Sequence, residues 1–146
     1  MLQTLRICLV VLGASAIAIA LSILVLGAGA TASMAEGVFG AVSGWQGPPS
    51  ERWPATMDSE LRFYAALWGA YGVVVLRAAT NLPRTLPQTP WIAAVFFVGG
   101  VGRVLSWVGV GAPHPFFTLL MVIELSLPVL MALLWLTARS QRRHGP

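Results

Sequence analysis

The sequence predicts an all-α integral membrane protein, a four-helix bundle with both termini cytoplasmic and an extended outer loop between its first two helices. Of its 146 residues, 57% are hydrophobic and only 10% are charged, whereas soluble domains are about a quarter charged. The mean hydropathy is +0.78. Four long apolar runs predict the helices, because about 20 helical residues cross a hydrocarbon layer of about 30 Å. We therefore expect residues 1–146 to form a single membrane domain.

The four predicted spans cover residues 7–26, 61–79, 91–111 and 116–137. Backbone groups in lipid must be hydrogen-bonded internally, and these runs lack the alternation of barrel strands, so each predicts a helix. The first run has an alternative interpretation as a secretory signal peptide, because "ATA" resembles a small-residue cleavage site. Its apolar core is longer than the roughly 7 to 15 residues of a signal peptide, which favours a retained helix.

The arginines predict the orientation, because basic residues close to span ends are held on the cytoplasmic side. All nine basic residues are arginine. Four spans place six of them on one side: Arg6, Arg77, Arg84, Arg139, Arg142 and Arg143. We expect a multi-pass protein in the cytoplasmic (inner) membrane of a bacterium, with these arginines on membrane lipids, chiefly anionic headgroups. The net charge of +4 is accounted for without nucleic acid.

The outer loop, about residues 27–60, is the only substantial segment predicted outside the membrane. Residues 34–42 predict a short helix with Met34, Val38 and Val42 along one side, followed by turn residues. Trp45 and Trp53 suit a membrane interface, where the indole body stays apolar and its N–H stays wet. The loop is interpreted either as a lid resting on the bundle or as a cap for a ligand or partner. It carries four acids, Glu36, Glu51, Asp58 and Glu60, and the basic Arg52.

Arg103 lies in the middle of the third apolar run and needs a partner. An antiparallel hairpin turning near Pro113 places Arg103 and Glu124 at matching depths, about 15 Å below the outer surface at a rise of about 1.5 Å per residue. Each charge alone would cost about 2.5 to 3.5 kcal/mol or more at a helix centre. The sequence therefore predicts that they pair inside the bundle, with backbone carbonyls or Ser106, one turn away, as further hydrogen-bond partners of the guanidinium.

Small residues predict the packing faces of the helices, because close approach of backbones drives helix association in lipid. These faces are Gly13, Ala16, Ala20 and Gly27 on the first helix, Arg62, Ala65, Ala66, Gly69 and Gly72 on the second, and Gly102, Ser106 and Gly109 on the third, beside Gly99 and Arg103.

A second charge cluster lies at the entry to the second span. Asp58 or Ser59 is expected to cap this helix, and Arg62 to bridge to Asp58, to Glu124 or to a ligand anion. A cap with an interfacial arginine is the simpler interpretation. Arg62 and Arg103 together indicate a polar binding site, since one carboxylate cannot fully neutralise two guanidinium groups. Further candidates on the outer side are Asp58, Tyr64, His114, Trp45 and Trp53.

Catalytic and metal-binding motifs are poor by comparison. Cys8 lies inside the first span and is best interpreted as a small core residue. His114 and His144 do not have metal-ligand spacing. We predict no catalytic residue, no metal and no cofactor.

Three segments resemble a known family. "DSELRFYAALWGAYG", "GGVGRVLSWVGVGAPHP" and "ELSLP" are similar to signature segments of the DUF4345 family of small four-helix membrane proteins. The resemblance covers the last three predicted helices, and the outer loop is extended relative to the family pattern. It supports the fold without supplying a reaction, and the matching positions are Asp58, Arg62, Phe63, Gly102, Arg103, Ser106, Pro113, Glu124 and Pro128.

Three function classes remain open. The first, which we favour, is a non-catalytic accessory or scaffold subunit of a cell-envelope or lipid-handling complex, bound to a larger membrane protein or to further copies of itself. The second is a lipid or small-molecule binding or transport protein with a polar site at Arg103, Glu124 and Arg62. The third is a membrane-embedded, isomerase-like enzyme that uses Glu124 as proton donor or acceptor.

Overall fold

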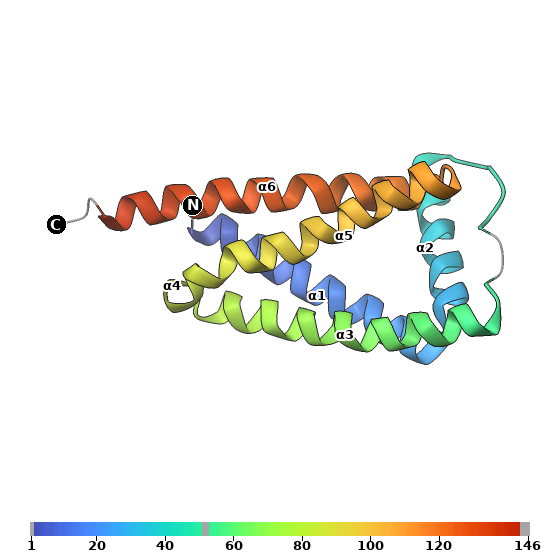
Figure 1. The fold of residues 1–146 in the computed structure, drawn as a ribbon, viewed down its shortest axis with the longest axis horizontal. Coiled ribbons are helices and arrows are strands. Elements are labelled where there is room, and N and C mark those ends of the chain that lie inside the picture. Colours follow the sequence, from blue (N-terminus) through green and yellow to red (C-terminus); the bar gives the residue numbers. More distant parts are fainter. Residues whose placement is uncertain (1, 51–52, 144–146) are drawn as a thin grey trace. The chain divides into compact units, whose positions relative to one another are not determined.

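The computed structural model describes residues 2–50 and 53–143, without the side chains of residues 142 and 143. Glu51, Arg52 and His144, like the side chains of Arg142 and Arg143, lie outside the described residues. The described chain is all helical, as predicted (Figure 1). Its elements are α1 (Leu2–Leu26), α2 (Ala28–Ser43), α3 (Ala55–Thr80), α4 (Leu82–Thr85), the 3-10 turn η1 (Leu86–Gln88), α5 (Thr89–Val110) and α6 (Pro115–Arg143).

Four helical segments are long and apolar enough to cross a membrane, in agreement with the four predicted spans. They are Leu2–Leu26, Ala55–Thr80, Leu82–Val110 and Pro115–Gln141.

The chain divides into two compact units, and the division falls inside α1 and α3. Unit 1 comprises Met1–Val11 and Val75–Pro146, and unit 2 comprises Leu12–Val74. Each unit is described separately below.

Unit 1 contains the α5–α6 hairpin and the α4–η1 link (Figure 1). Most of its buried hydrophobic side chains are larger than alanine and include Leu5, Leu9, Phe96 and Met131. The two helices of the hairpin are in close contact at Gly100, where a Cβ atom would lie 2.9 Å from Leu125 Cδ2 and 3.1 Å from the backbone carbon of Glu124. Figure 1 places the start of α1, the α4–η1 link and the end of α6 at one end of this unit.

The contact between α5 and α6 corrects the packing face predicted for α5. Nothing lies within 4 Å of a Cβ atom built on Gly102 or Gly109, and Ser106 is exposed. Residues 93, 96, 100 and 103 share a face, because this spacing keeps side chains on one side of a helix. Gly100 belongs to that face, whereas the predicted stripe lies beside it.

Unit 2 packs α1 against α3 through small residues, as the sequence predicts. A Cβ atom on Gly72 would lie 2.8 Å from the carbonyl oxygen of Gly13 and 3.1 Å from Ala16 Cβ. A Cβ atom on Gly69 would lie 3.2 Å from Ala20 Cβ. Glycine is required at residue 72 because the obstacle is backbone, which cannot rotate away.

The segment expected to be an outer loop is mostly helical. The helix predicted over residues 34–42 extends over Ala28–Ser43, and α3 begins at Ala55 rather than at residue 61. Met34, Val38 and Val42 follow one side of α2, as predicted, and this side is exposed. The buried residues of α2 are Ala28, Ala32 and Glu36. The two alanines lie one turn apart and have small side chains, so this side of the helix can pack closely within unit 2.

Candidate functional site

Arg103 and Glu124 form the predicted ion pair across the α5–α6 hairpin. Arg103 Nε donates to Glu124 Oε2 over 2.7 Å. The exposed fractions of the two side chains differ, at 36% for Arg103 and 11% for Glu124. The guanidinium carbon of Arg103 also lies 5.9 Å from the centre of the Phe117 ring, a cation–π contact. Sequence reasoning did not identify Phe117, although it lies two turns before Glu124 on the same helix.

The glycines of α5 make room for this carboxylate. Gly100 lets the backbone of α6 approach at Glu124, and a Cβ atom on Gly99 would lie 3.9 Å from Glu124 Oε2. Pro128, inside α6, has no N–H to offer the carbonyl of Glu124. The structure thus buries the acid of the pair and leaves about a third of the base uncovered.

Ser106 does not assist the pair. Its side chain is exposed, and within the described part of the chain no hydrogen bond joins it to Arg103. The predicted role of Ser106 as a further partner of the guanidinium is therefore wrong.

Asp58 and Arg62 join three helix segments in unit 2. Arg62 Nε donates to Asp58 Oδ2 over 2.7 Å, and Arg62 Nη1 donates to the carbonyl oxygen of Leu24, at the end of α1, over 2.6 Å. The backbone N–H of Ala28, the first residue of α2, donates to Asp58 Oδ1 over 2.9 Å. Gly27, which separates α1 from α2, has a φ of 91°, a conformation that favours glycine.

Asp58 therefore caps α2. The prediction that it caps its own helix, α3, is wrong. Because α3 begins at Ala55, both Asp58 and Ser59 lie inside it. Arg62 has Asp58 as its partner in unit 2, and Arg103 has Glu124 in unit 1. Of the partners predicted for Arg62, the structure shows Asp58, and each of the two guanidinium groups has its own carboxylate.

A buried acid in unit 2 was missed by sequence reasoning. Glu36 accepts hydrogen bonds from the backbone N–H of Ser50, over 3.1 Å, and from the Ser50 hydroxyl. These bonds tie the chain after α2 back to that helix. The spacing of Ala28, Ala32 and Glu36 is the signal that could have identified the buried face.

A cleft of about 450 Å³ lies beside these groups in unit 2. Its wall includes the polar side chains of Ser33, Ser50, Asp58 and Arg62, together with Trp53. Of the predicted outer residues, Asp58 and Trp53 thus meet at one cleft.

The other outer candidates have local roles. Tyr64 is exposed and packs edge to face on Phe63, with ring centres 5.6 Å apart. Trp45 is half-buried and packs over Gly47. His114 Nδ1 accepts a hydrogen bond of 3.1 Å from the backbone N–H of Phe116, at the start of α6. No group of three metal-binding side chains occurs among the residues that the structure describes.

Comparison with known proteins identifies the family. The model of a family described as "Domain of unknown function (DUF4345)" matches residues 4–136. The match includes α1, which the three sequence segments did not cover. No curated protein matches the chain, and no solved structure matches it. The extent of the family match shows that this chain belongs to the DUF4345 family.

Proposed function

We propose that this protein is a non-catalytic, multi-pass protein of the bacterial inner membrane that serves as an accessory or scaffold subunit. In this proposal α5 docks a transmembrane helix of a larger cell-envelope or lipid-handling membrane protein. The observation that carries it is the uneven exposure of the ion pair, in which Arg103 is 36% exposed while Glu124 is nearly covered.

A guanidinium group that is exposed at lipid depth needs further polar partners. Arg103 lies seven residues before Val110, the end of α5, about 10 Å along the helix at about 1.5 Å per residue. Charged groups at lipid depth face a bundle interior or a water-filled cavity and pair with polar groups. A neighbouring helix that offers a carbonyl or carboxylate oxygen would complete the donors of Arg103.

The small residues beside Arg103 support the same surface. Gly102, Ser106 and Gly109 follow one side of α5, and nothing lies within 4 Å of a Cβ atom on either glycine. Stripes of small residues allow close approach of a second helix in lipid. We define the docking face as Gly102, Arg103, Ser106 and Gly109.

Site-specific photo-crosslinking in cells tests the proposal. A photoreactive phenylalanine analogue at Ser106 should give an adduct with one larger protein. The same analogue at Val108, which is 83% exposed and about 200° around the helix from Ser106, should give none. Arg103→Leu should reduce the Ser106 adduct.

Three outcomes would contradict the proposal. An adduct at twice the mass of the chain would make the partner a second copy, and a crosslink within the chain would make the cover another part of this protein. Equal adducts at Ser106 and Val108 would show that α5 has no specific docking face.

The predicted orientation belongs to the same proposal. A cysteine at the exposed Gln46, in a Cys8→Ser background, should react with an impermeant maleimide in intact cells. Reaction only after the membrane is opened would place this segment, and not the termini, in the cytoplasm.

The unit 2 cleft favours a second candidate, the binding of a lipid or small polar molecule. Its wall combines an indole with charged groups, a common lining of ligand sites. Two nitrogens of Arg62 are already hydrogen-bonded, so a ligand would meet the remaining Nη2. A molecule that copurifies with the wild type and is lost with Trp53→Ala, but not with Trp45→Ala, would support this candidate.

A further inference from the structure

Unit 1 carries a large excess of positive charge. Its one acid is Glu124, already bound to Arg103. The unit has six other arginines: Arg6, Arg77, Arg84, Arg139, Arg142 and Arg143. In the described residues, neither Arg84 nor Arg139 has an ion-pair partner. Both side chains are exposed and therefore accessible to an anion from outside the unit.

Arg84 and Arg139 line one cleft. The cleft has a volume of about 380 Å³, and its wall consists of Pro83, Arg84, Leu86, Pro87, Trp135 and Arg139. One side is the α4–η1 link and the other is the last part of α6. Two arginines from separate segments thus meet an indole and three apolar side chains at one place.

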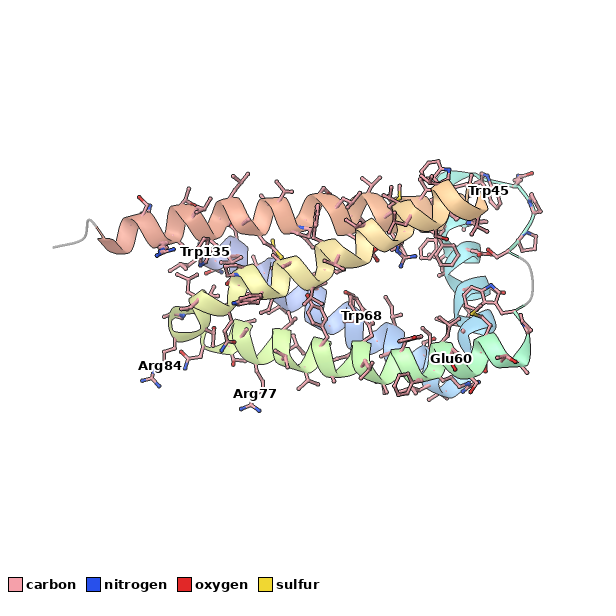
Figure 2. All side chains as sticks on the ribbon, viewed as in Figure 1. Trp45, Glu60, Trp68, Arg77, Arg84 and Trp135 are labelled. Carbon is pink, nitrogen blue, oxygen red and sulfur yellow. The ribbon has the colours of Figure 1, made fainter. Side chains whose placement is uncertain are left out.

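The link that holds Arg84 is anchored on both sides. Leu82 and Leu86 are buried, and Thr85 Oγ1 donates to the carbonyl oxygen of Ala78 over 2.6 Å. Proline fixes φ at residues 83 and 87. In Figure 2, Arg84 projects from this link, away from the helices.

The opposite wall is ordered by a contact within α6. The guanidinium carbon of Arg139 lies 5.3 Å from the ring centre of Trp135, one turn earlier, a cation–π geometry. Trp135 and Arg139 lie near the end of the candidate span Pro115–Gln141, while Arg84 lies near the start of the span Leu82–Val110. Tryptophan at such a position is typical of the headgroup level of a membrane.

We propose that this cleft binds the phosphate of an anionic phospholipid headgroup. The guanidinium group of Arg139 holds the phosphate oxygens, and the guanidinium group of Arg84 joins it when its exposed, flexible side chain turns from its outward position toward the cleft, since arginine matches phosphate with parallel N–H donors. Trp135 and Leu86 pack against the glycerol and the first carbons of the acyl chains. A free phosphate ion would use the arginines but leave this apolar wall uncovered, which favours the lipid.

Native mass spectrometry of the purified protein in detergent tests the proposal. Dioleoyl phosphatidylglycerol should bind more tightly than dioleoyl phosphatidylcholine. Arg84→Gln and Arg139→Gln should each weaken phosphatidylglycerol binding about fivefold, as expected for one basic residue at an anionic lipid. Arg77→Gln is the matched control, because Arg77 is an exposed arginine of the same unit that does not line the cleft; this variant should bind like the wild type.

Each contrary result overturns a defined part of the proposal. Equal binding of the two lipids by the wild type, a test that needs no variant, would exclude an anionic site. Equal losses in all three variants would show attraction by overall charge instead of a cleft. Displacement of phosphatidylglycerol by an equal concentration of inorganic phosphate would assign the cleft to the free ion.

Discussion

Unit 2 buries mainly alanine, whereas most of the buried hydrophobic residues of unit 1 are larger, among them leucine, methionine and phenylalanine. Their ion pairs differ in the same way. In unit 2, Asp58 and Arg62 lie one turn apart on a single helix and bind the ends of two others. In unit 1, Arg103 and Glu124 join two helices directly. Unit 2 therefore depends on close backbone approach and on the polar corner formed by Asp58 and Arg62. Unit 1 depends on larger side chains and on one charge pair between helices.

The largest effect is expected in the charge pair of unit 1. Arg103→Leu strands the nearly covered Glu124 and should cost about 3 to 5 kcal/mol of stability, as breaking a buried pair does. Glu124→Leu should cost less, because the more exposed Arg103 can reorient its flexible side chain toward a wetter level. The measurement is thermal unfolding in detergent of the wild type and both single variants.

The double variant Arg103→Leu/Glu124→Leu is the control for this prediction. It leaves no uncompensated charge, so its stability should exceed that of Arg103→Leu. If the two single losses simply add, the pair has no coupling energy and its assigned role is wrong.

The next effect is expected at the backbone contact of unit 2. Gly72→Ala places a Cβ atom 2.8 Å from the Gly13 carbonyl oxygen and should cost about 1 to 3 kcal/mol, the usual range for overpacking. Gly37→Ala is the matched control, because nothing lies within 4 Å of its Cβ atom. A helical Gly→Ala change at an open position raises stability by up to about 1 kcal/mol, so equal melting temperatures for the two variants would contradict the packing described.

A smaller effect is expected at the polar corner of unit 2. Asp58→Ala removes the cap of α2 and the partner of Arg62, so it should lower the melting temperature measurably. Glu60→Ala, an exposed acid two residues away (Figure 2), should change stability by less than about 0.5 kcal/mol. Equal unfolding curves for the two variants would show that the corner contributes nothing.

The same comparison shows what the sequence could predict. Apolar run length and small-residue spacing predict the four candidate spans and the α1–α3 contact. Matching depths predict the pairing of Arg103 with Glu124, because one acid and one base in the same hairpin leave each other few alternatives.

Other features depended on which elements meet in space. Asp58 caps α2 across 30 residues of sequence, and a local pattern assigned it to the nearest helix start. The burial of Glu36 was missed because the helix was predicted to begin at residue 34, which left out Ala28 and Ala32, the other residues of its buried face. On α5, Gly100 and Gly102 lie two positions apart and so on different faces, and composition alone does not say which one meets α6.

The smallest effect is expected at Gly102, and it sharpens the comparison because the same change at Gly100 should be costly. A Cβ atom on Gly100 would meet Leu125 at 2.9 Å and backbone at 3.1 Å, whereas one on Gly102 meets nothing within 4 Å. Gly102→Ala should therefore not destabilise the purified protein, and, like Gly37→Ala, it should raise the free energy of unfolding by up to about 1 kcal/mol. Gly102→Leu should also fold, yet it should reduce the crosslink from Ser106, because a large side chain on the docking face keeps a second helix at a distance. A loss of stability in Gly102→Ala as large as in Gly100→Ala would mean that this face is already occupied within the chain, and a Ser106 adduct unaffected by Gly102→Leu would mean that no helix packs there.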